Sequence, residues 1–97
     1  MELTVKQRQY LKGLAHSLEP IVMIGEKKGL SAAVIKEVIN SLNAHELIKV
    51  RVLGDDRELR NNLIDELCNA TGAANVQHIG KLLVLYRPGD KAINIPK

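Results

Sequence analysis

An unbroken apolar run near the end of the chain constrains the fold more than any other feature. Residues 82–85 read Leu-Leu-Val-Leu, and successive side chains of a strand point to opposite faces of its sheet. The run therefore predicts a central strand covered on both faces, with helices on each side of the sheet. Gly80 and Lys81 precede it, and glycine first in a two-residue loop is typical of a type II′ hairpin turn. We expect a hairpin of strands 75–79 and 81–87.

Three segments repeat their apolar residues at helical spacing. Thr4 and Ser31 are suitable N-caps for the first two helices. Asp55, with Glu58 three residues later, resembles a capping box for the third helix, which Gly72 closes. The predicted buried stripes are Leu11, Leu14, Ala15 and Leu18 in the first helix, Val34, Ile35, Val38, Ile39 and Leu42 in the second, and Leu59, Leu63, Ile64, Leu67 and Cys68 in the third.

Two further strands complete the pattern. Pro20 ends the first helix and leads into a β-branched apolar run at residues 21–24. Residues 46–53 alternate, with Ile48, Val50 and Val52 on one side and Lys49 and Arg51 on the other. The order is α-β-α-β-α-β-β, in which helical crossovers imply parallel pairing and the hairpin adds an antiparallel pair. We therefore expect an α/β fold with a four-stranded mixed sheet and three helices.

A glycine-bracketed basic turn joins the first predicted strand to the second helix. Gly25 and Gly29 flank Lys27 and Lys28. Glycine permits close backbone approaches that a Cβ would forbid, and a helix N-terminus carries unpaired N–H groups and partial positive charge. The turn is a candidate anion cradle, and nucleic acid is the polymeric anion it would suit. The alternative is a solvated turn whose lysines serve solubility.

The charge of the chain is uneven. Ninety-seven residues predict one domain, with a core over about residues 3–88 and a polar tail at 89–97. The net charge is +3, yet residues 55–66 hold five acids against two arginines. Twelve bases and six acids remain elsewhere. Such a distribution favours an acidic partner bound on one side of the molecule.

The residues offer no recognisable catalytic or metal-binding pattern. Cys68 is the only cysteine, which excludes an internal disulfide and favours a buried structural thiol in a reducing compartment. His16, His45 and His78 fall in separate predicted elements. The glycine turn is neither a Walker A sequence nor G-x-G-x-x-G. We expect a non-enzymatic, cytoplasmic protein without cofactor, metal or membrane-spanning segment.

The low number of aromatic residues limits which modes of nucleic-acid binding are possible. Tyr10 and Tyr86 are the only aromatic residues, and the position of Tyr86 beside the leucine run predicts a core role. This argues against an RRM or another platform that stacks bases on aromatic rings. A backbone-directed mode remains, in which a glycine loop approaches phosphates as in KH domains.

Segments along nearly the whole chain resemble a CRM domain (chloroplast RNA splicing and ribosome maturation), most closely the single-domain bacterial YhbY-type proteins. The matching residues are 9–16 (QYLKGLAH), Pro20, Ile24-Gly25, Gly29-Leu30-Ser31, 45–50 (HELIKV), Thr71-Gly72-Ala73, Gln77 and 79–88 (IGKLLVLYRP).

The resemblance implies a fold similar to the C-terminal domain of translation initiation factor 3, RNA binding, and association with precursors of the large ribosomal subunit. The GxxG loop of the family maps onto Gly25–Gly29, which is one residue longer here. The family's basic surface maps onto residues such as Lys12, Lys49 and Arg87.

The leading hypothesis is thus a monomeric, non-catalytic RNA-binding protein acting in large-subunit assembly. The alternative is a protein-interaction module that docks on a ribosomal protein or assembly factor, and a small enzyme ranks third. The candidate RNA-binding residues are Gly25, Lys27, Lys28 and Gly29 in the loop, with Lys6, Arg8, Lys12, Lys49, Arg51, Lys81 and Arg87 around it.

Overall fold

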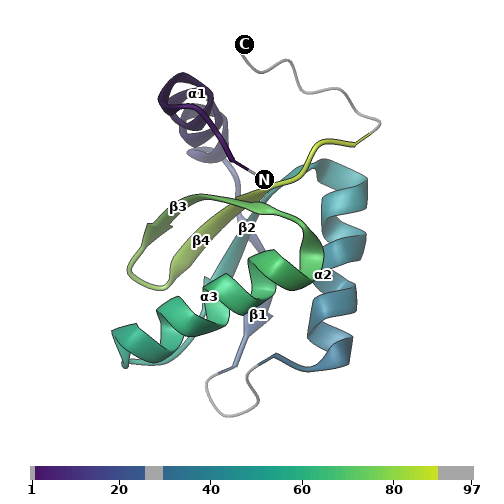
Figure 1. The fold of residues 1–97 in the computed structure, drawn as a ribbon, viewed down its shortest axis with the longest axis vertical. Helices are drawn as coiled ribbons and strands as arrows, with labels where there is room; N and C mark the ends of the chain where they lie inside the picture. Colours follow the sequence, from purple (N-terminus) through teal and green to yellow (C-terminus); the bar gives the residue numbers. More distant parts are fainter. Residues whose placement is uncertain (1, 26–29, 90–97) are drawn as a thin grey trace.

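The computed structural model describes residues 2–25 and 30–89 (Figure 1). Its elements are α1 (Val5–Ala15), β1 (Pro20–Ile24), α2 (Ala32–His45), β2 (Leu47–Val52), α3 (Arg57–Thr71), β3 (Ala74–Ile79) and β4 (Leu82–Tyr86). The predicted order and the four-stranded mixed sheet are confirmed. The strand order is β1-β2-β4-β3, with β1 parallel to β2 and the other pairs antiparallel. The leucine-rich strand β4 is central, as its sequence predicts.

The hairpin between β3 and β4 has the predicted turn. Ile79 pairs with Leu82, which leaves Gly80 and Lys81 as the loop. Gly80 has a φ of 57°, whereas Lys81 is not among the residues with positive φ. Positive φ at the first loop position alone is the signature of a type II′ turn.

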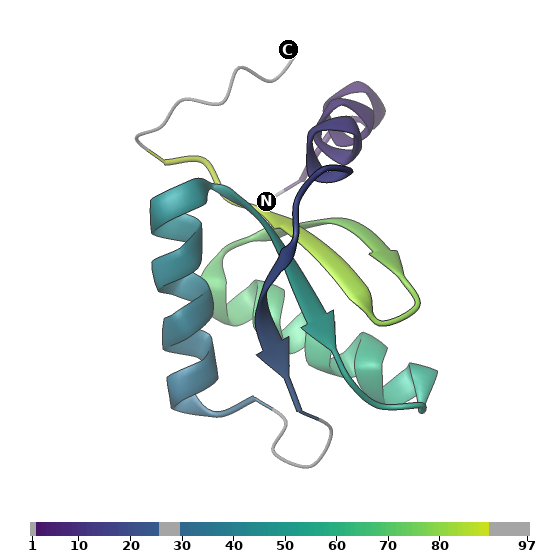
Figure 2. The ribbon, with the colours of Figure 1, turned by 180° about the vertical axis from the view of Figure 1, so that it is seen from behind.

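Apolar side chains fill both sides of the sheet, as the run at residues 82–85 predicts. On one side, α2 and α3 pack through Val38, Leu42 and Leu67 onto a core that includes Leu83 and Leu85 of β4. On the other side, α1 packs onto a smaller core through Leu11 and Ala15, against Leu47, Val76, Val84 and Tyr86. Figure 2 shows that α1 lies over one end of the sheet and leaves the other end of this face uncovered. That open area is where the candidate site is found.

The helix caps agree with the sequence except at α3. Thr4 forms a capping box with Gln7, and the Ser31 hydroxyl accepts a hydrogen bond from the backbone N–H of Val34 at 3.2 Å. Gly72 ends α3 in the left-handed conformation, at a φ of 73°.

The predicted cap at Asp55 is wrong by one residue. The Asp56 carboxylate caps α3 by accepting hydrogen bonds from Glu58 N at 3.0 Å and Leu59 N at 3.2 Å. Asp55 points elsewhere, and its Oδ1 lies 3.2 Å from Nζ of Lys81 in the hairpin turn. Asp56 has the extended backbone conformation of an N-cap, with a φ of −81° and a ψ of 107°.

The predicted apolar stripes are also corrected. Leu14 is 39% exposed and Leu59 is 65% exposed, although both fit the helical spacing. The buried residues of α1 are Leu11 and Ala15. Leu18 lies beyond the end of the helix, yet it packs partly buried against the same core, as predicted. The first turn of α3 precedes the part of the helix that packs on the core.

Cys68 is half-buried against the core of α2 and α3. Burial, and next the nearby Asp65 carboxylate, raise the pKa of its thiol. A thiol held in its neutral form this way is a poor nucleophile, which agrees with the predicted structural role. Within the described ranges, no helix is both long and apolar enough to cross a membrane.

Candidate nucleic-acid interface

The positive charge on the open face of the sheet comes from β2, whose side chains point alternately to the two faces. Leu47 lies under α1, while Val50 and Val52 face the core of α2 and α3. Lys49 and Arg51 therefore point toward the α1 side, beyond the part that α1 covers. Lys49 is half-buried and pairs with Val84, and Arg51 is exposed. Two cations thus follow one another along an uncovered sheet face.

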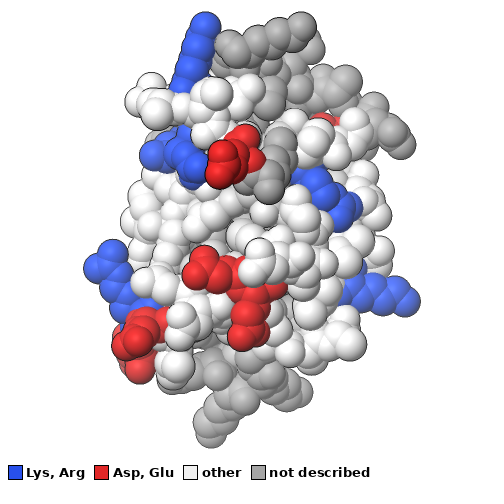
Figure 3. Space-filling view, viewed as in Figure 1, with Lys and Arg blue, Asp and Glu red and all other residues white. Residues whose placement is uncertain are grey.

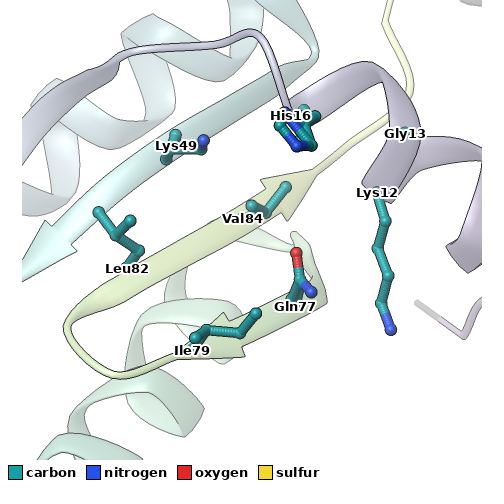
Figure 4. Close-up of a pocket in the computed structure, with 9 residues that line it drawn as sticks. Lys12, Gly13, His16, Lys49, Gln77, Ile79, Leu82 and Val84 are labelled. Atoms are coloured by element: carbon teal, nitrogen blue, oxygen red, sulfur yellow. The ribbon is translucent and has the colours of Figure 1, made fainter.

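A hollow lies between α1 and this part of the sheet (Figure 4). Its volume is about 490 Å³. We call it the basic hollow, and it is lined by Lys12 and His16 of the α1 region and by Lys49, Gln77, Ile79, Leu82 and Val84 of the sheet. Its lining combines aliphatic strand side chains with two lysines and contains no acidic residue.

Arg8 fixes α1 in the position that forms this hollow. Its guanidinium donates hydrogen bonds to the carbonyl oxygens of Asn75 and Val76, the latter at 3.1 Å, on the edge strand β3. Lys12 is one helical turn further along the same face and is half-buried at the hollow. The predicted RNA contact at Arg8 is therefore engaged in docking the helix, whereas Lys12 lines open space.

Gly25 lies at the same end of the sheet as the open face. It follows β1, whose last residue Ile24 pairs with Val52, and Val52 N donates a hydrogen bond to Lys81 O at 2.7 Å. Gly25 is exposed and no atom lies within 4 Å of a Cβ placed on it. Its φ is not positive, so the conformation alone does not require glycine here. Lys27, Lys28 and Gly29 lie outside the described residues.

Three of the predicted cations follow one another across the open face. We call Lys12, Lys49 and Arg51 the basic track, since they run from α1 along β2 toward the end of β1. Gly25 lies beyond that end and borders the α3 side of the sheet, beside Asp56 and Leu59. Arg51 pairs with Met23 of β1 on one side and Leu82 of β4 on the other, which places it between the hollow and that end. The structure brings Lys12, Lys49 and Arg51 together on one face.

Three other predicted residues are not part of the basic track, although Lys81 adjoins its Arg51 end because Arg51 pairs with Leu82. Lys6 is exposed near the start of α1, and Lys81 pairs with Asp55. Arg87 follows β4 at the end away from the hairpin, where its guanidinium donates to the carbonyl oxygen of Thr71 at 2.7 Å and to the side-chain oxygen of Asn43. It joins β4 to α3 and α2.

We expect replacement of Arg87 by alanine to lower the free energy of unfolding by about 1–3 kcal/mol, because two oxygen atoms lose a charged donor. The slope of log RNA affinity against log salt concentration should stay unchanged, since this guanidinium is already bound within the protein. Urea denaturation and a salt titration of RNA binding measure the two quantities. A shallower salt slope at unchanged stability would instead return Arg87 to the RNA interface.

Acidic side chains gather away from the basic track. The acids of residues 55–66 belong to α3 and the turn before it, and α3 packs on the sheet face opposite α1. Figure 3 shows red acidic side chains over α3 in the lower half of that view. The uneven charge of the sequence therefore corresponds to two different faces of the folded domain.

The two tyrosines do not form a stacking platform. Tyr86 is 2% exposed and packs under α1, which confirms its predicted core role. Burial, and next the nearby Glu46 carboxylate, raise the pKa of its hydroxyl. Tyr10 is 41% exposed on α1.

No metal-binding cluster is formed in the described part of the chain. His16 follows α1, His45 ends α2 and His78 lies on β3. Across residues 2–25 and 30–89, no three His, Cys, Asp or Glu side chains come together in a way that could hold a metal ion.

Two polar residues of the basic hollow were not predicted as site residues. Gln77 and His16 line it together with Lys12 and Lys49. Their isolated positions in the sequence give no sign of this, because the hollow joins α1 to three strands. The signals in the sequence are a polar residue inside a predicted strand, in the case of Gln77, and the presence of both residues among those that resemble a CRM domain.

Three helices around a four-stranded mixed sheet, with a basic track on one partly open face, define a small α/β domain whose candidate site is a surface for a polyanion. Residues 3–87 match the CRS1/YhbY (CRM) domain family. The chain belongs to this family.

Similar proteins agree with this assignment. An RNA-binding protein of Haemophilus influenzae is 52% identical over 96 residues, covering 98% of this chain and 96% of its own length. A probable RNA-binding protein of Bacillus subtilis is 38% identical, covering 97% and 99%. The solution structure of a Staphylococcus aureus protein, described there as a candidate RNA binder, superposes with a TM-score of 0.85 at 39% identity and covers 98% of this chain and 100% of its own.

Proposed function

We propose that this protein is a non-catalytic RNA-binding protein of the cytoplasm that associates, as a monomer, with precursor large-subunit ribosomal RNA during ribosome assembly. The observation that carries the proposal is the basic track on the open sheet face, with the acids of α3 on the opposite face. Family membership and the relatives named for RNA binding support the same class of partner.

The chemistry of the track suits contacts to the RNA backbone. Lysine and arginine neutralise phosphates, and phosphate contacts fix the position of a protein on nucleic acid without reading its sequence. Gly25 has open space around it, so a backbone phosphate can approach there. Lys27 and Lys28 of the adjoining loop would add two phosphate contacts at this end of the track.

The open face favours RNA over a docking protein. A protein-docking site is expected to present a cohesive apolar patch. Met23 and Ile79 are exposed here, at 61% and 63%, but Lys49 and Arg51 lie among the strands between them. Cations interspersed with apolar side chains suit RNA, whose backbone is anionic and whose bases have flat faces that can lie on apolar groups.

Crosslinking RNA to the protein in cells, followed by sequencing of the bound RNA, tests the proposal. We expect enrichment of precursor large-subunit ribosomal RNA over other abundant RNAs, and a several-fold loss of crosslinked RNA in the variant Lys27→Ala/Lys28→Ala. The control variant Lys36→Ala/Arg57→Ala removes the same charge from exposed positions on α2 and α3.

Each part of the proposal has its own contrary result. Bound RNA without enrichment of ribosomal sequences argues against the role in assembly. Equal losses in the loop variant and in the control argue against a specific contribution of the loop.

A further inference from the structure

We propose that the basic hollow is a nucleobase-binding site, in which one unstacked base of single-stranded RNA lies on an aliphatic floor. This inference rests on the proposed function and adds to it a contact that neither phosphate neutralisation nor the glycine loop supplies. It gives a protein without an aromatic platform a means of holding a base.

The floor of the hollow is made by side chains on the α1 side of β3 and β4. Val84 is buried, Leu82 is half-buried and Ile79 is 63% exposed. Ile79 pairs with Leu82, so their side chains are neighbours on one face. An exposed isoleucine next to a half-buried leucine leaves apolar area in contact with water, and a flat base laid on it removes that area from solvent.

The polar side chains of the hollow surround its apolar floor. Figure 4 shows Lys12 extending from α1 on one side and Lys49 of β2 on the other side, with Gln77 of β3 between them. The Gln77 amide offers both a donor and an acceptor, which suits the hydrogen-bonding edge of a base. The two ammonium groups suit the flanking phosphates.

Size and charge agree with this occupant. The volume of about 490 Å³ falls within the range of about 300–1,000 Å³ that is usual for sites of small organic ligands. None of the lining residues is acidic, so an anionic nucleotide meets no repulsion there. The hollow also adjoins Arg51 of the basic track, which allows the RNA chain to continue from the bound base toward Gly25.

Titration of single nucleotides tests the hollow directly. The intact protein, with isotope-labelled methyl groups, is titrated separately with each of the four ribonucleoside 5′-monophosphates and with ribose 5-phosphate, and followed by NMR. We expect at least one nucleotide to shift the methyl signals of Ile79, Leu82 and Val84, while ribose 5-phosphate leaves them in place. If no nucleotide moves these signals further than ribose 5-phosphate does, the base site is disproved.

A matched pair of variants extends the test to RNA oligonucleotides. Ile79→Glu places a carboxylate on the floor, and Leu59→Glu places one at an equally exposed position of α3, where the native leucine is 65% exposed. We expect the first variant to weaken binding of a single-stranded oligoribonucleotide about tenfold relative to the second, since its carboxylate interrupts the apolar floor and would have to be buried under the base. Gln77→Met, which keeps the length of the side chain, should alter the preference among the four nucleotides.

The outcomes separate this inference from the proposed function. Equal oligonucleotide affinities for Ile79→Glu and Leu59→Glu overturn the base site, while retained RNA binding leaves the proposed function standing. Shifts of the methyl signals with a nucleotide, combined with failure to bind any oligonucleotide, would mean that the hollow holds mononucleotides only, which overturns both the RNA base site and the proposed function.

Discussion

Replacing Leu67 by alanine is expected to lower the free energy of unfolding by about 2–5 kcal/mol. Leu67 is completely buried in α3 and belongs to the core between α2, α3 and the sheet. Truncation removes apolar contacts and leaves a cavity that the surrounding strands can close only partly. Against a typical total stability of about 5–15 kcal/mol, this loss is large.

Leu59→Ala is the matched control for this prediction. Leu59 lies on the same helix and in the same predicted stripe, but it is 65% exposed, and we expect a change within about 0.5 kcal/mol. Urea denaturation followed by circular dichroism measures both variants. Similar losses for the two leucines would mean that the first turn of α3 packs against the core in solution.

Removing both lysines of the basic hollow should have the largest effect on RNA binding. In Lys12→Ala/Lys49→Ala, we expect the slope of log affinity against log salt concentration to become shallower by about 1.4, because each lost phosphate contact to single-stranded RNA accounts for about 0.7. The affinity itself should fall most at low salt, where counterion release contributes most. Binding titrations across a series of salt concentrations measure the slope.

The control for this variant is again Lys36→Ala/Arg57→Ala, which has the same net charge. Its exposed positions on α2 and α3 lie off the basic track, so its salt slope should match that of the unchanged protein. If both variants shift the slope equally, net charge alone governs binding and the track has no special role. Thermal unfolding of each variant checks that the half-buried stem of Lys49 is not needed for folding.

Local patterns predicted most of the fold. The run at residues 82–85 predicted a central strand, and the alternation of residues 46–53 predicted which side chains of β2 share a face. Both patterns reflect the two-residue repeat of a strand, which holds whatever lies nearby. The exposure of Leu14 and Leu59 was not predictable in this way, because helical spacing shows which residues share a stripe and not how far the stripe is covered.

The candidate site, like the fold, was predictable from the sequence only in part. The sequence alone determined the order of elements, the cations available and the absence of an aromatic platform, since these follow from residue type and spacing. The tertiary structure decided their use: Arg8 and Arg87 bind carbonyl oxygens within the protein, whereas Lys12 and Lys49 face a shared hollow. That distinction depends on where α1 lies on the sheet, and packing between residues distant in the chain fixes this position.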